Sequence, residues 1–274
     1  MKKALFLSFI LPACIVAVAQ EDAQQKIKDS ILNEGKMLYK SEMASWYGTD
    51  IFLEKIKGKE ISSGGYFSYS DQQGNKCIFF SKSDTPVVLA TILFDDSYDV
   101  KKARYDDQSR SFTSYEAAIY AIRKQAFDAI NSDTLFKVYN NTSLNLIPII
   151  NGNDKKVYVL TGPKVNGVVV FGNDYLLTFD ANNQLTGKKR LHKNIIPVNY
   201  SKEKEQVFGT MHSHLPETGD YITATDICTL MLYGKFAGWQ QHIVISANYV
   251  SIWNCSSNQL ATVPREVWDK QKQD

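Results

Sequence analysis

The spacing of apolar residues predicts a helix near the start of the chain. Over residues 21–46, Ile27, Ile31 and Leu38 fall near helical spacing, with charged residues between them. The pattern then changes to short apolar and aromatic runs, which are typical of strands at 65–70, 76–81 and 87–94. The first two runs flank turn residues at 71–75, so we expect them to pair as a β-hairpin.

A charged, polar stretch separates this region from the rest of the chain. Residues 95–112 carry pairs of acidic and basic side chains and little apolar pattern, so we expect a loop there and a boundary between two parts. Beyond it, Thr113 and Glu116 have the spacing of a capping box. This predicts a helix that runs to about Ile130.

Strands dominate the second part of the chain. Apolar runs predict them at 144–150, 156–161, 168–180, 206–214, 242–246 and 249–253. A helix is expected over 223–233, ended by Gly234. This order predicts an α/β fold with a mixed sheet flanked by helices. We divide it into an N-terminal helix with a small antiparallel sheet (20–105), a second region (112–263) and a C-terminal tail (264–274).

The first nineteen residues form a predicted signal peptide. Lys2 and Lys3 give a short positive start, and residues 4–19 are almost entirely apolar. The run ends in Ala-Val-Ala, the pattern after which signal peptidase cuts, so that Gln20 becomes the mature N-terminus. The run is too short for a stable membrane span, and no later stretch approaches the length needed. We therefore expect export, to the periplasm or the medium, with no integral membrane span.

A lipoprotein signal is the alternative. The run Leu11-Pro12-Ala13-Cys14 resembles a lipoprotein cleavage box, which would leave Cys14 acylated. Two features favour simple export instead. Pro12 stands beside the small residue before the cut, and residues 15–19 are apolar where a polar tether is expected.

The charge of the mature chain argues against nucleic-acid binding, and its cysteine count argues against a disulfide-stabilised fold. Removal of the signal peptide takes away two lysines and leaves 29 basic and 29 acidic side chains, from 31 and 29 in the full chain. A neutral chain has no electrostatic footprint for nucleic acid. The odd number of mature cysteines excludes a closed disulfide framework. Cys228 and Cys255 could pair, with Cys77 left as a buried thiol.

Two histidines and an aspartate form a candidate metal site. His212 and His214 are two apart on a predicted strand, so their side chains point to the same face. Asp226 follows a loop with Pro216 and Gly219 and lies in the first turn of the next helix, where it can face back toward the strand. Two imidazoles and one carboxylate suit zinc and leave a fourth position for water, whose pKa the metal lowers to about 7.

The same residues also have an ordinary structural interpretation. Thr223 and Asp226 have the spacing of a helix N-cap, where an acidic side chain is favourable. The histidines could lie on an exposed strand, because a His-x-His pattern recurs by accident. The chain has only four histidines, however, and two of them lie together before an acid-bearing helix. That concentration favours the metal site.

This segment resembles the signature of JAMM (MPN-domain) zinc metalloproteases, which is His-x-His-Pro, a short spacer and Ser-x-x-Asp. The resemblance covers residues 112–263. It implies a cytidine-deaminase-like core and a zinc ion held by His212, His214 and Asp226. It also places Thr223 where the family has the serine that steadies the developing oxyanion. The implied activity is hydrolysis of peptide or isopeptide bonds by a zinc-activated water.

The chain departs from this signature in three ways. Leu215 stands where the family has proline, and the spacer is one residue longer. The family also uses an upstream glutamate as general base, but residues 117–202 contain no glutamate. Loss of a general base costs about 10²- to 10⁴-fold in rate. Glu42 is then the first candidate base, followed by Glu217 and Asp174.

Two functions remain open. The first is a zinc-dependent hydrolase of the cell envelope, and the second is an inactive JAMM-like module that binds a peptide or an envelope partner. The missing upstream glutamate favours the module, whereas the complete ligand triad favours the hydrolase. His192 and His242 are predicted to be structural histidines rather than ligands.

Overall fold

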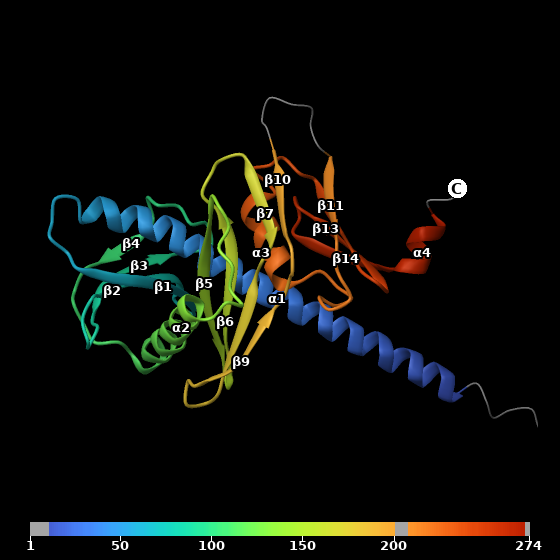
Figure 1. Cartoon of the computed structure of the whole chain (residues 1–274), viewed down its shortest axis with the longest axis horizontal. Helices are drawn as coiled ribbons and strands as arrows, with labels where there is room; N and C mark the ends of the chain where they lie inside the picture. The colour runs from blue at the N-terminus through green and yellow to red at the C-terminus, as the bar shows by residue number, and fades with distance from the viewer. Residues whose placement is uncertain (1–10, 201–207, 272–274) are drawn as a thin grey trace, which may run out of the picture.

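The computed structural model describes residues 11–200 and 208–271, with side chains from Asp22 onward. It has an α/β fold, shown in Figure 1. The helices are α1 (Leu11–Lys55), α2 (Ser114–Ser132), α3 (Ala224–Tyr233) and α4 (Arg265–Lys270). The strands are β1 (Ser63–Asp71), β2 (Gly74–Ser81), β3 (Val88–Phe94), β4 (Arg104–Asp106), β5 (Thr142–Asn151), β6 (Asp154–Pro163), β7 (Val168–Gly172), β8 (Tyr175–Phe179), β9 (Leu185–Arg190), β10 (Ile195–Asn199), β11 (Gly209–Ser213), β12 (Gln241–Ile245), β13 (Tyr249–Asn254) and β14 (Gln259–Pro264).

The predicted signal peptide falls outside the part of the chain whose side chains are described. Its first ten residues have no described backbone either, so its cleavage stays a prediction. Among the described helices, none is both long enough and apolar enough to cross a membrane.

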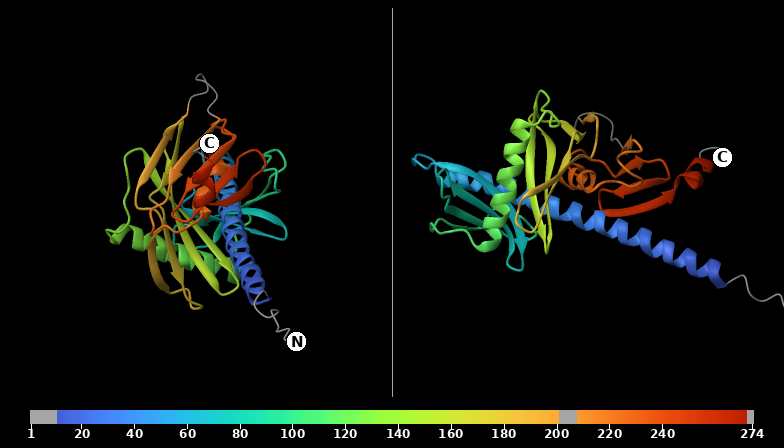
Figure 2. Two further views of the ribbon diagram at one scale, coloured as in Figure 1. Left: turned by 90° about the vertical axis from the view of Figure 1, so that its right-hand side faces the viewer. Right: turned by 60° about the horizontal axis from the view of Figure 1, so that its bottom comes forward.

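Helix α1 packs against both parts of the chain. Near its C-terminal end, Phe52 stacks on Phe79 of β2, with ring centroids 3.8 Å apart. In its middle it crosses α3 at Gly35, where a Cβ atom would lie only 2.6 Å from Ile227 Cγ2. Figure 2 shows α1 running along the length of the molecule. The helix predicted over 21–46 is therefore confirmed but longer, and both predicted regions share it.

The first sheet is antiparallel, with strand order β1-β2-β3-β4. Strands β1 and β2 pair across the turn between Asp71 and Gly74, so the predicted hairpin is confirmed. The segment 95–112 is not wholly a loop, because Arg104–Asp106 forms β4 beside β3. A strand this short has too few positions to show an apolar pattern.

The predicted capping box is present at the start of α2. Thr113 Oγ1 accepts the Glu116 N–H, and the Glu116 carboxylate accepts the Thr113 N–H. The helix packs on the antiparallel sheet β5-β6-β8-β9. The strand predicted over 168–180 is interrupted, since Asn173 adopts a φ of 51° between β7 and β8. As a result β7 leaves this sheet and pairs with β10.

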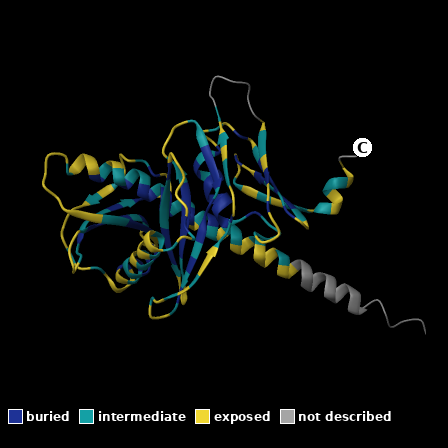
Figure 3. Ribbon diagram, in the orientation of Figure 1, coloured by how far each residue is buried: buried dark blue, intermediate teal, exposed yellow. Residues whose placement is uncertain are grey.

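The sheet β11-β12-β13-β14 is mixed, because β11 runs parallel to β12 and the other pairs are antiparallel. Figure 3 shows α3 as a largely buried helix beside it. The α/β class is thus confirmed, but beyond the small antiparallel sheet at the N-terminal end the described strands form three further sheets rather than the single mixed sheet expected. Within the C-terminal tail of 264–274, Arg265–Lys270 forms the short helix α4.

Candidate metal centre

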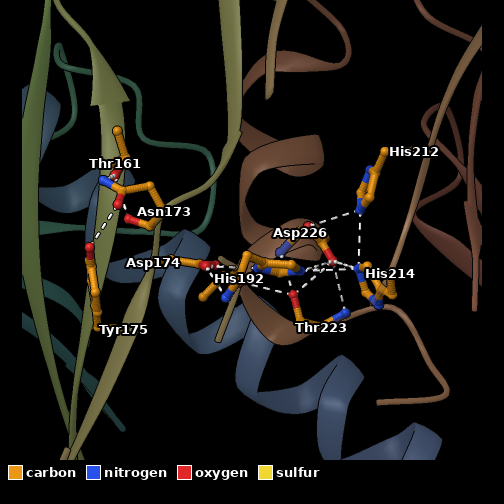
Figure 4. A network of polar contacts seen from close by, with 10 residues as sticks. Thr161, Asn173, Asp174, Tyr175, His192, His212, His214, Thr223 and Asp226 are labelled. Carbon is orange, nitrogen blue, oxygen red and sulfur yellow. Dashed lines mark hydrogen bonds and ion pairs between the residues drawn. The ribbon is translucent and has the colours of Figure 1, made fainter. Parts of the chain in front are cut away.

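Four buried side chains meet where the β7–β10 layer faces β11 and α3. They are His192, His212, His214 and Asp226, and one donor atom from each lies within 4.8 Å of all the others. His192 follows β9, His212 lies on β11, His214 follows that strand, and Asp226 is in the first turn of α3. Figure 4 shows the three imidazoles turned toward the Asp226 carboxylate. This group could hold a metal ion.

Five of the separations between donor atoms lie between 3.0 and 3.6 Å. His214 Nε2 lies 3.0 Å from His192 Nε2, 3.1 Å from His212 Nε2 and 3.2 Å from Asp226 Oδ2. The Asp226 oxygens lie 3.6 Å from the Nε2 atoms of His192 and His212. Donors about 2.0–2.1 Å from a tetrahedral zinc ion stand roughly 3.3 Å apart. These five separations are therefore close to those of a zinc shell, and all four donors lie within 4.8 Å of one another.

Hydrogen bonds among the four side chains do not account for this geometry. A ring nitrogen offers either one proton or one in-plane lone pair, so it makes one good hydrogen bond. His214 Nε2 nevertheless has three polar atoms at 3.0–3.2 Å. A cation at the centre would satisfy all three contacts, because each donor would direct its lone pair at the metal.

Outer partners orient two of the histidines. Asp174 Oδ1 lies 2.7 Å from His192 Nδ1 and also accepts the His192 backbone N–H. His242 Nε2 lies 2.9 Å from His212 Nδ1. In both cases the outer ring nitrogen is engaged, which leaves Nε2 free to face the centre, as is typical of metal-bound histidines. All four histidines of the chain thus meet in one buried network.

Asp226 serves the helix cap and the ligand group together. Its Oδ2 accepts the Thr223 backbone N–H at 3.0 Å and the Thr223 hydroxyl at 2.7 Å. In return, Thr223 Oγ1 accepts the Asp226 N–H, which completes a capping box. The structural interpretation and the metal interpretation are therefore compatible, since the cap fixes the carboxylate that faces the histidines.

The surroundings of Asp226 and His212 favour the protonation states that bind metal, which are the ionised carboxylate and the neutral imidazole. Burial would raise the pKa of Asp226, but the neighbouring histidines hold that pKa well below its ordinary value. Burial lowers the pKa of His212 to about 4, so this ring is neutral. Burial also opposes charge on His192, but Asp226 and Asp174 outweigh it and raise its pKa to about 9. A metal ion binding here would displace the His192 proton.

A small pocket reaches the ligands from outside. Its volume is about 30 Å³, and His192 and His212 form part of its wall, with Phe171, Ile196 and Leu215 among the other lining residues. A water molecule needs roughly 10–15 Å³ of such space. The pocket therefore admits water, and none of the described residues that line it is acidic.

The structure brings together the three predicted ligands, but none of the three predicted bases lines the pocket beside them. Glu42 is buried in α1, where its carboxylate accepts a hydrogen bond from Asn145 Nδ2 at 3.0 Å and burial raises its pKa to about 7. Glu217 is exposed. Asp174 is close to the site but is paired with His192.

Sequence reasoning named two further residues of the site but missed their roles. His192, predicted to be structural, lies among the four donors, and Asp174 orients it. No local motif marks either residue, because they come from two different turns. The only signal in the sequence is the scarcity of histidine, with four in the chain.

The pairing of Cys228 with Cys255, which the sequence left open, is not formed. Both thiols are free and buried, as is that of Cys77. Cys228 packs in the cluster between α1 and α3, whereas Cys255 belongs to the cluster around Trp253. The two cysteines therefore contribute to different parts of the core.

Comparisons with known proteins leave this chain without an assigned relative. No family model, no curated protein and no solved structure matches it.

Proposed function

We propose that this chain is an exported zinc-binding protein whose metal site is closed by four protein ligands, and that it acts as a binding module rather than as a hydrolase. The observation that carries the proposal is the position of His192, whose Nε2 lies 3.0 Å from His214 Nε2 and 3.6 Å from Asp226 Oδ2. Catalytic zinc sites keep three protein ligands and one open position, whereas structural sites have four.

Zinc is the metal that this donor set fits best. Three imidazole nitrogens and one carboxylate oxygen are of intermediate softness, and they lie within 4.8 Å of one another, close enough to share one small cation. Ca²⁺ and Mg²⁺ prefer more oxygen ligands in larger or octahedral shells. The charges also balance, because Asp226 and Asp174 together offset a divalent cation in a buried site.

The order of the candidate ligands resembles that of a JAMM metallopeptidase site. The groups that hydrolysis would need, however, are either engaged in other contacts or missing from the pocket. The Thr223 hydroxyl donates to Asp226 Oδ2, so its proton is not directed toward a substrate oxyanion. The pocket beside the ligands has no acidic residue among those described and is about 30 Å³ in volume. A peptide group needs more space than one or two water molecules.

A zinc ion with four protein ligands would act as a structural cross-link between the segments that carry those ligands. It would join the turn that carries His192 to β11 and to the start of α3. The turn lies between β9 and β10, and both of these strands belong to other sheets than β11. We infer that the metal fixes their relative position, and so shapes a surface for a peptide or envelope partner.

The test is metal analysis joined to an activity assay on the purified mature chain. We expect one zinc ion per chain by elemental analysis, and no cleavage of peptide or isopeptide libraries by the zinc-loaded protein. Absence of any bound metal would overturn the zinc proposal. Cleavage that the His212→Ala variant abolishes would instead establish the hydrolase, since that substitution removes a ligand.

A further inference from the structure

A second histidine lies directly behind one of the ligands. His242, on β12, is 1% exposed, and its Nε2 lies 2.9 Å from His212 Nδ1. Its other nitrogen, Nδ1, lies 2.7 Å from Thr210 Oγ1. Strand register brings these residues together, because Thr210 on β11 is paired with His242 on the parallel strand β12.

Metal binding by His212 would determine which atoms carry protons in the contacts from His212 through His242 to Thr210. When His212 Nε2 faces the metal, the ring proton of His212 is on Nδ1 and is donated to His242 Nε2. His242 then carries its own proton on Nδ1 and donates it to Thr210 Oγ1. Each nitrogen and oxygen in the series thus has one assigned role, and reversal of the first step would place the His212 proton on Nε2, where it would face the metal.

Aromatic packing holds the His242 ring in the plane that this hydrogen bond needs. The ring stacks on Phe171, with centroids 4.7 Å apart and an interplanar angle of 18°. It also stacks on Trp239, at 6.2 Å and 27°. His242 therefore cannot turn away from His212 without loss of these contacts.

A neutral acceptor at this position suits the charge of the site. Histidine ligands usually donate to a carboxylate, a backbone carbonyl or water. Here Asp174 already provides one outer carboxylate, and Asp226 is a second negative group. A further carboxylate in place of His242 would leave the buried site with a net negative charge around a divalent ion, which burial disfavours.

We propose that His242 is a positioning residue of the metal site, which fixes the tautomer and ring orientation of His212 and so sets the affinity for zinc. This inference rests on the proposed function, because it requires that His212 bind a metal. Strand β12 would then carry a residue that orients a metal ligand, although β12 carries no ligand itself.

The test compares His242→Phe with His242→Gln by titration with zinc against a chelator of known affinity. Phenylalanine keeps an aromatic ring but removes the acceptor, so we expect zinc affinity to fall about 10- to 100-fold, as for other outer partners. Glutamine can accept from His212 Nδ1 through its side-chain oxygen, so most of the affinity should return. In the metal-free protein, ¹⁵N chemical shifts should show His212 protonated on Nδ1 in the parent chain and mixed tautomers in His242→Phe.

A matched control separates positioning from general destabilisation. Val244→Ala removes a fully buried side chain from the same strand and is expected to lower the melting temperature without change in the His212 tautomer. If Val244→Ala weakens zinc binding as much as His242→Phe does, or if His242→Phe binds zinc like the parent, the positioning role is wrong. If the parent chain itself binds no zinc, the proposed function fails first, and the tautomer measurement still tests the contact.

Discussion

His192 Nε2 lies 3.0 Å from His214 Nε2, although the two residues are 22 positions apart and belong to different layers of the fold. Each of the two residues is anchored independently. Asp174 holds His192 through both its ring and its backbone N–H. The backbone N–H of His214 is bonded to Ile245 O, which extends the pairing of β11 with β12. The short distance between the two rings is therefore imposed by the scaffold.

Replacement of His192 distinguishes a four-ligand site from a three-ligand one. We expect His192→Ala to weaken zinc binding by more than the roughly 10- to 100-fold that loss of an outer partner causes, because it removes a ligand. Equilibrium titration with a competing chelator measures this. Lys189→Ala, at an exposed position of the preceding strand, is the control and should bind zinc like the parent. Unchanged affinity in His192→Ala would show that three ligands suffice.

Removal of the metal should lower thermal stability. A ligand that binds only the folded state at about 100 times its Kd stabilises it by roughly 2.7 kcal/mol. In a chain of this size, that corresponds to a fall of roughly 5–10 °C in Tm on chelation. Differential scanning fluorimetry with and without a chelator tests this. The Asp226→Asn variant should show a much smaller shift, and an equal shift in both would point to metal binding elsewhere.

The buried Glu42 should make the fold less stable above neutral pH. Burial raises its pKa from the ordinary 4.5 to about 7, partly offset by the hydrogen bond from Asn145. A raised carboxyl pKa means that the folded state favours the protonated form, so the cost of ionisation grows from pH 4.5 to about 7 and is constant above that. Glu42→Gln should therefore leave stability at pH 4 unchanged and raise it at pH 8 by up to about 3 kcal/mol.

Denaturant unfolding at the two pH values measures the effect of Glu42→Gln. The matched control is Glu54→Gln, an exposed glutamate of the same helix, which should show no gain at either pH. Zinc affinity should be the same in Glu42→Gln as in the parent, because Glu42 does not face the ligands. A large loss of zinc binding would contradict that placement.

Export is tested at the N-terminus of the natural product. Sequencing of the mature chain should begin at Gln20, since the apolar run ends in an Ala-x-Ala site. Cys14→Ser separates this from the lipoprotein alternative. With a simple signal peptide, the variant is still cut before Gln20, whereas a lipoprotein signal would leave it uncut. An uncleaved product in the cytoplasm would contradict both.

Local features of the sequence were sufficient for several elements. The β1–β2 hairpin follows from two apolar runs around Asp71 and Gly74, and the start of α2 follows from Thr113 and Glu116. His212, His214 and Asp226 could be grouped because a strand, a turn and a helix N-terminus place them within fifteen consecutive residues. In each case the interacting residues are close in sequence, so secondary-structure period alone sets their geometry.

Only the tertiary structure decided the rest. The break at Asn173 sends β7 and β8 to different sheets and leaves Asp174 beside His192, 18 positions away. His212 meets His242 across 30 positions through the pairing of β11 with β12. Periodicity reports which face of an element is buried, but it does not report which other element covers that face. His192, the fourth candidate ligand, and its outer partner Asp174 depend on which element covers which face. Their positions are therefore decided only when the layers pack together.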